Sequence, residues 1–161
     1  ELQDAVCRAG LLHDAGKADL RFQRERLGWR GGPLLAKSGG TTAQSVRRRR
    51  GMGLLPGLWR HEQLSAAMAH GQPDLGPERT LVVRLVGTSH GHGRPFFPHG
   101  PEAFDGEQSV ASPDAIAELF TNGSGWSDVI DATHRRFGVW GSAYLEAILR
   151  AADCQVSEEG S

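Results

Sequence analysis

The chain has 161 residues, 39% of them hydrophobic, and carries 18 basic against 19 acidic side chains. This length suits one domain around a single core. The near-balance of charge leaves no global positive field of the kind that marks many nucleic-acid binders. The 22 Gly and eight Pro predict long loops and a smaller core than the length suggests. The one local exception in charge is the run Arg47–Arg50.

Several further features of the sequence bear on the cellular compartment. There is no apolar run near the ~18 residues of a membrane span, and no signal peptide is seen. Cys7 and Cys154 have no metal-type spacing. They are therefore expected to be reduced thiols in a cytoplasmic protein. The chain opens within a helical pattern, so we expect the natural protein to begin upstream of Glu1.

The first third predicts two helices and a long loop. Residues 1–14 carry apolar side chains three and four apart, which is typical of a helix. Asp19–Leu27 is predicted as a second, short helix. The pattern is lost over Gly28–Gly57, where glycine pairs recur, so a long and mobile loop is expected there.

The middle of the chain predicts three more helices. Helical patterns return over Trp59–His70 and Glu78–Thr88; the second run could also be a short strand, but no partner strand is evident. Gly87–Gly106 is expected to be a loop, mobile from Gly91 onward. Ser112 is then a candidate N-cap, with Pro113 in the first turn of a helix that reaches Phe120.

The last third predicts two helices, Trp126–Phe137 and Trp140–Ala152, interrupted at Gly138. No hairpin signal and no repeat is visible. The predicted fold is therefore mainly α. The final helix is expected to bury one broad face, made of Trp140, Tyr144, Leu145, Ile148, Leu149 and Ala152.

The stretch from Leu11 to Lys17 is the most informative. It places His13 and Asp14 side by side at the end of an apolar helix, with Gly16 permitting a turn. Imidazole nitrogen and carboxylate oxygen are ligands for Mn, Fe, Co, Ni or Zn. Alone, the pair is weak evidence, because a surface His-Asp pair at a helix end is the commoner case.

Three other residues change that balance. Asp153 lies four residues after Leu149, on the expected buried stripe, where a carboxylate must be paired or bind a metal. His61 begins one apolar helix and His90 ends another. Each has an ordinary alternative: a frayed helix end, a core histidine, a solvated loop. Four helices that each begin or end with such a residue favour one shared metal site. His70, His99 and His134 lack this context and are interpreted as structural.

The order His-Asp, His, His, Asp on successive helices resembles the HD superfamily of metal-dependent phosphohydrolases. The local sequences resemble the HD nuclease domain of the CRISPR-associated nuclease–helicase of type I interference systems, most closely its I-U (or I-G) branch, over residues 1–157. The matching segments are His13-Asp14-Ala15-Gly16-Lys17-Ala18-Asp19 with Arg21-Phe22-Gln23, Arg60-His61-Glu62 with Ser65, His90 with Gly93-Arg94-Pro95, and Ile148-Leu149-Arg150-Ala151-Ala152-Asp153.

The resemblance implies an HD-domain helical bundle that binds one or two divalent ions (Mn, Fe, Co or Ni) and cuts single-stranded DNA in antiviral defence. It assigns one metal site to His13, Asp14 and Asp153, and a second to Asp14, His61 and His90. Lys17 would contact the scissile phosphate. The implied partners are a helicase in the same or another chain and an RNA-guided surveillance complex. Arg94, Arg47 and Arg48 would contact the DNA.

Two departures from the family pattern bear on activity. The family has a further His upstream of the HD pair, and residues 1–12 contain none. Ser89 stands where the first of two adjacent His is common, so His92 is a possible substitute ligand.

Two alternatives therefore stay open. One is an HD phosphohydrolase of nucleotides or cyclic dinucleotides, with Trp29, Trp59, Phe96 and Phe97 available for base stacking. The other is a metal-poor HD module that only binds DNA or a partner.

Overall fold

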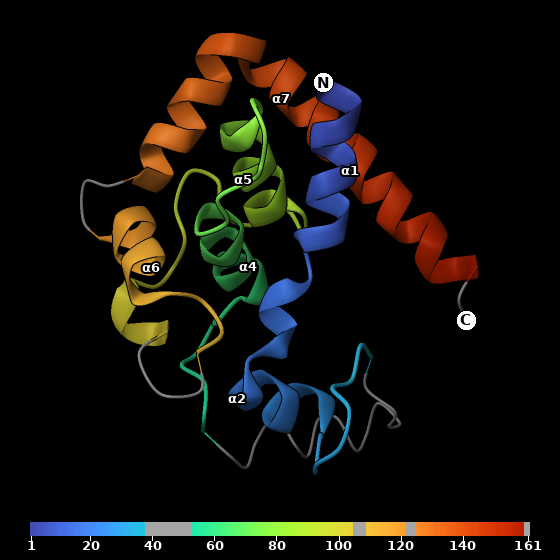
Figure 1. Ribbon diagram of the computed structural model, residues 1–161, viewed down its shortest axis with the longest axis vertical. Helices are drawn as coiled ribbons and strands as arrows, with labels where there is room; N and C mark the ends of the chain where they lie inside the picture. The colour runs from blue at the N-terminus through green and yellow to red at the C-terminus, as the bar shows by residue number, and fades with distance from the viewer. Residues whose placement is uncertain (38–52, 105–108, 122–124, 160–161) are drawn as a thin grey trace.

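The computed structural model describes residues 1–37, 53–104, 109–121 and 125–159. All regular structure in these ranges is helical and none of it is strand, which confirms the mainly-α prediction (Figure 1). Residues 79–88 are helical as well, so the strand alternative for that run is wrong. Among the described helices, none is both long enough and apolar enough to cross a bilayer.

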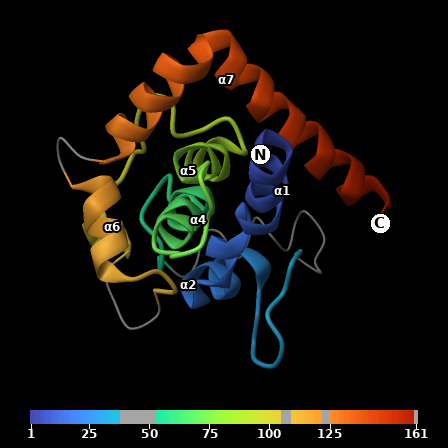
Figure 2. The same cartoon turned by 45° about the horizontal axis from the view of Figure 1, so that its top comes forward.

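The centre of the molecule is the helix pair α4 (His61–His70) and α5 (Arg79–Thr88), which pack against each other. Both are rich in small and apolar residues, and nearly all of their side chains are buried. Helices α1 (Leu2–Leu12), α6 (Pro113–Phe120) and α7 (Gly125–Glu159) surround this pair (Figure 2). Burial on several sides is consistent with the weak amphipathic pattern of α4.

The segment after α1 departs from the prediction in detail. Helix α1 ends at Leu12, two residues early, and a 3₁₀ turn, η1 (Ala15–Ala18), follows. Asp19 then caps α2 (Leu20–Phe22) by accepting hydrogen bonds from the amides of its first turn. The chain continues into a π-helical turn, η2 (Gln23–Leu27), so the predicted short helix is present in two geometries.

Gly16 lies in a turn after α1, as predicted, and has a second role in packing. It lies inside η1, and a Cβ there would overlap the His61 carbonyl oxygen. Its amide donates to Ser65 Oγ at 2.8 Å, and that hydroxyl donates to the His61 carbonyl at 2.9 Å. The absence of a side chain thus lets η1 lie directly on the first turn of α4.

The two predicted loops are only partly loop. Residues 28–37 and 53–57 contain no helix, while 38–52, including Arg47–Arg50, lie outside the described residues. The second loop was predicted too long, because its residues Pro101–Phe104 form a 3₁₀ helix, η3. Phe104 is 1% exposed and packs near Trp59 and Phe120, so one buried ring anchors this turn. The mobility expected of these loops stays a prediction.

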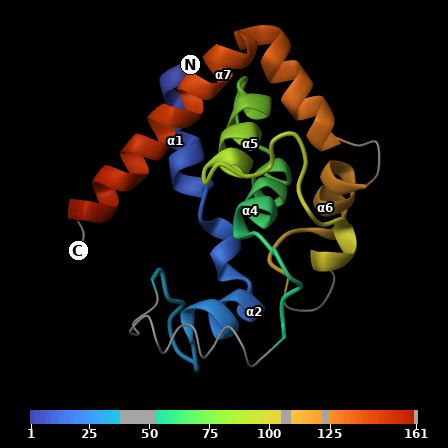
Figure 3. The ribbon, with the colours of Figure 1, turned by 180° about the vertical axis from the view of Figure 1, so that it is seen from behind.

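Helix α7 has two arms that meet at Gly138, whose φ of 69° breaks the helical geometry (Figure 3). The predicted interruption is therefore confirmed, and the Ser112 cap of α6 is confirmed too.

The buried face predicted for the second arm is correct only in part. Leu149 is 3% exposed and Leu145 packs against the core, but Trp140 is 87% exposed and Tyr144 is 68% exposed. After the bend, the arm turns its small and polar side chains inward, among them Ser142 and Glu146, with Leu149 beside them.

Candidate metal centre

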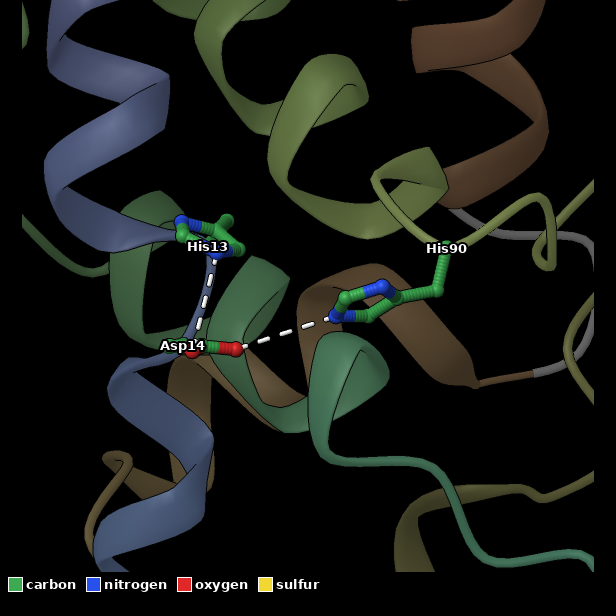
Figure 4. A group of neighbouring side chains, drawn as sticks. All are labelled: His13, Asp14 and His90. Atoms are coloured by element: carbon green, nitrogen blue, oxygen red, sulfur yellow. Dashed lines mark ion pairs between the residues drawn. The ribbon is translucent and has the colours of Figure 1, made fainter. Parts of the chain in front are cut away.

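The residues singled out in the sequence come together where several helices end. His13 is the C-terminal cap of α1 and Asp14 follows it. His61 is the first residue of α4, and His90 comes just after α5. Asp153 lies on the inward side of α7. Because α1, α4, α5 and α7 pack together, these five side chains converge on one place, part of which Figure 4 shows.

Asp14 is the centre of the group. Its Oδ1 lies 3.2 Å from His61 Nε2 and 3.7 Å from His90 Nε2. Its Oδ2 lies 3.6 Å from His13 Nε2 and 2.5 Å from Lys17 Nζ. His13 Nε2 is also 3.3 Å from Asp153 Oδ1. The two oxygens of one carboxylate therefore face two different sets of ligand-type groups.

The ligand atoms of His13, Asp14 and His90 all lie within 4.8 Å of one another. The Nε2 atoms of His13 and His90 are buried and form no hydrogen bond, although both lie at ion-pair distance from Asp14 (Figure 4). Buried polar atoms are normally hydrogen-bonded, so two such imidazole nitrogens around one carboxylate require an explanation. Imidazole nitrogens and carboxylate oxygens are suitable ligands for a divalent transition-metal ion. The residues present therefore fit such an ion.

The atoms behind the imidazoles fix their orientation. His13 Nδ1 lies 2.7 Å from the Gly10 carbonyl, which can only accept, so a neutral His13 keeps its lone pair on Nε2. His61 Nδ1 lies 3.3 Å from the carboxylate of Glu62, which is 1% exposed. Carbonyl and carboxylate partners of this kind are the usual support of metal-binding histidines.

Asp14 is ionised. Its partial burial alone raises the pKa of the carboxyl. The interactions of Asp14 with His61, His90 and Lys17 and the charge of His13 outweigh that effect and hold the pKa well below its usual range. The centre of the group is therefore an anion over the whole physiological pH range.

Three further residues considered in the sequence, Ser89, His92 and Arg94, do not belong to the close group of ligand atoms around Asp14. The Ser89 hydroxyl donates to the Val86 carbonyl at 3.0 Å, so it caps α5. His92 is exposed and does not belong to the close group of ligand atoms. Arg94 pairs with Glu146 at 2.8 Å, while Arg47 and Arg48 fall outside the described residues.

The histidines interpreted as structural all have partners away from Asp14. His70 lies 2.8 Å from Glu118, and His99 lies 2.7 Å from the Gly57 carbonyl. His134 lies 3.1 Å from the buried guanidinium of Arg84.

The contacts of Glu62, Arg84 and Arg150 were not predicted from the sequence. Glu62 belongs to the segment matched at His61, but its contact with that imidazole was not expected. Arg84 stands alone in an apolar run, and such a charge within a buried helix signals a buried partner. That partner is Glu146, with Oε1 3.0 Å from Arg84 Nε. The contact of Arg150 Nη1 with His90 Nδ1 at 3.0 Å had no sequence signal.

Two of the four aromatic residues considered for base stacking are committed to packing. Trp59 is 5% exposed, and Phe97 packs against Phe120 and Trp126. Phe96 is 69% exposed, and Trp29 donates its indole N–H to carbonyls of its own loop.

A scan against models of protein families finds no match to this chain. Searches of curated proteins and of solved structures also find nothing that matches. The assignment of function therefore rests on the geometry of the site and on the resemblance noted in the sequence.

Proposed function

We propose that the chain is an HD-type, metal-dependent phosphodiesterase that cleaves single-stranded DNA. One observation carries the proposal. Asp14 presents Oδ1 to His61 and His90 and Oδ2 to His13, while two of the three facing nitrogens are buried without a hydrogen bond. A bridging carboxylate between two sets of ligands is what a site for two ions needs.

The division of ligands follows from the same geometry. His13, Asp14 and Asp153 would hold one ion, because His13 Nε2 lies between the two carboxylates. Asp14, His61 and His90 would hold the other. When bound, such ions activate water and stabilise the leaving oxygen of a phosphodiester.

The protein's own groups provide position and charge. Gly10 and Glu62 orient His13 and His61. Lys17 contacts Asp14 and lies close enough to balance charge that develops on a phosphate beside it. In a type I interference system, an RNA-guided complex would open the target and a helicase would supply the single strand. We propose these two as the partners.

The two alternatives have less support. A nucleotide phosphohydrolase would require a closed base-binding pocket, and two of the aromatic candidates are packed in the core. A binding module without metal is favoured by one contact, Lys17 Nζ at 2.5 Å from Asp14 Oδ2, because an ion there would have to share the carboxylate.

The deciding experiment gives the protein Mn²⁺ and four substrates: a single-stranded oligonucleotide, its duplex, a nucleoside monophosphate and a cyclic dinucleotide. We expect cleavage of the single strand only, abolished by EDTA. His90→Ala should lose this activity, while the neighbouring His92→Ala should keep it.

Each other result has a definite meaning. If the nucleotides are hydrolysed and the single strand is not cleaved, the proposal is wrong and the chain is instead a nucleotide phosphohydrolase. Failure of the wild-type protein to bind Mn²⁺ or to hydrolyse any substrate would favour the binding module.

A further inference from the structure

A cavity of about 260 Å³ adjoins the metal centre on the α7 side. His90 belongs to both places, because its ring contributes to the group around Asp14 and also lines the cavity. The other wall is the second arm of α7, from Ala143 to Arg150. Any strand that has one phosphate at the metal centre therefore has this cavity immediately beside it.

The cavity has an excess of positive charge. Arg94 and Arg150 line it, and the one carboxylate among its described lining residues is Glu146. That carboxylate is shared, since Arg84 lies 2.9 Å from Oε1 and Arg94 lies 2.8 Å from Oε2. Two guanidinium groups thus share one carboxylate, and Arg150 adds a further positive charge to the cavity. An anion in the cavity would reduce this imbalance.

The two lining arginines differ in how they are held. Arg94 is fixed through Glu146 to the buried Arg84, which also donates to Thr133 Oγ1 at 2.7 Å. Its side chain is nevertheless 44% exposed. The contact described for Arg150 is His90 Nδ1, a neutral acceptor. A phosphate oxygen is a stronger acceptor for a guanidinium than a neutral nitrogen is.

We propose that this cavity is a phosphate-binding subsite, in which Arg94 and Arg150 hold the backbone phosphate next to the one at the metal centre. This inference rests on the proposed function and specifies its substrate. A substrate that uses both places must carry two phosphates joined by a sugar, so a strand fits and a mononucleotide does not. A second cavity, of about 330 Å³, continues from the shared residues Gly91 and Arg94 to the exposed Phe96.

The test measures binding without catalysis. Fluorescence anisotropy of a labelled oligothymidylate is followed in EDTA over a range of salt concentrations. The proteins are the wild type, Arg150→Gln, Arg94→Gln and the control Arg135→Gln, which removes one exposed charge elsewhere on α7. Thermal unfolding shows whether each variant is folded.

We expect Arg150→Gln and Arg94→Gln each to weaken binding about tenfold, as for the loss of one charge-assisted hydrogen bond. The slope of log affinity against log salt should fall by about 0.7 for each lost contact with a single strand. Arg135→Gln should bind like the wild type.

Unchanged binding in both variants, or an equal loss in all three, would overturn the subsite. So would a wild-type protein that does not bind the oligonucleotide. Because no metal is present, these outcomes are independent of hydrolysis. A folded protein that binds as expected but never cleaves DNA would contradict the proposed function and leave the subsite standing.

Discussion

Arg150 contacts His90 with Nη1 3.0 Å from Nδ1, and this contact is incompatible with metal binding by the same imidazole. A guanidinium can only donate, so Nδ1 must accept and a neutral His90 carries its proton on Nε2, the atom that faces Asp14. A metal needs the lone pair of Nε2, which moves the proton to Nδ1. Two donors would then face each other, and Arg150 would have to leave.

Removing Arg150 is therefore expected to strengthen metal binding. Arg150→Met should tighten Mn²⁺ binding by roughly three- to tenfold, the range for one competing hydrogen bond. Isothermal titration without substrate measures the affinity. Arg94→Met is the matched control, because it removes a charge from the same cavity but not from His90. Equal gains in both variants would show that charge alone, and not the donor conflict, sets the affinity.

Gly16→Ala should destabilise the fold. A Cβ at Gly16 would overlap the first turn of α4 and disturb the bond of its amide to Ser65. We expect a loss of about 2–3 kcal/mol in the free energy of unfolding, within the range for overpacking a tight contact. Gly57→Ala is the control, since no atom lies within 4 Å of a Cβ built there. Chemical denaturation measures the free energy of unfolding of both variants. Equal values for the two would contradict the role given to Gly16.

The buried pair of Arg84 and Glu146 should show strong coupling. Glu146→Leu leaves the guanidinium of Arg84, which is 1% exposed, without its carboxylate. The expected cost is about 3–5 kcal/mol in the free energy of unfolding. The double variant Arg84→Met with Glu146→Leu removes both charges and should cost less than the two single changes together. Strict additivity in this cycle would show that the two charges do not depend on each other.

The ionised Asp14 predicts how stability depends on pH in the metal-free protein. Its pKa is lowered by folding, so its contribution is present above the unfolded value and is lost as pH falls below it. The unfolded value is about 3.9. Below it, the wild type should lose stability relative to the variant Asp14→Asn. A difference that does not change down to the lowest accessible pH would contradict the assigned shift.

Much of the fold and most of the convergence could be predicted from the sequence. Apolar spacing marks the helices, and His or Asp at the ends of those helices marks the site. The remainder depends on contacts between distant residues. The bend at Gly138 is visible in the sequence, but the direction of the bend is not, so Trp140 was wrongly assigned to the core.

The missed features share this cause. Arg84 and Glu146 are 62 residues apart, and the sequence alone does not say which charge pairs with which. The contact between Gly16 and Ser65 spans 49 residues and depends on the packing of η1 on α4. Packing, rather than local preference, decides such details.

The central claim is that Asp14 is the bridging ligand of a catalytic metal centre. Asp14→Asn keeps the size of the side chain but replaces the anion with an amide, a much weaker ligand. The fold should survive, because the apolar core does not include this residue. Asp128→Asn on the exposed side of α7 makes the same chemical change away from the site.

The most direct test is the rate of single-stranded DNA cleavage in Mn²⁺ for the wild type and these two variants. We predict that Asp14→Asn is slower by at least ~10²-fold, the size expected when one electrostatic contact to the transition state is lost. Asp128→Asn should cleave at the wild-type rate. Full activity in a folded Asp14→Asn protein would contradict the claim and place the catalytic centre elsewhere.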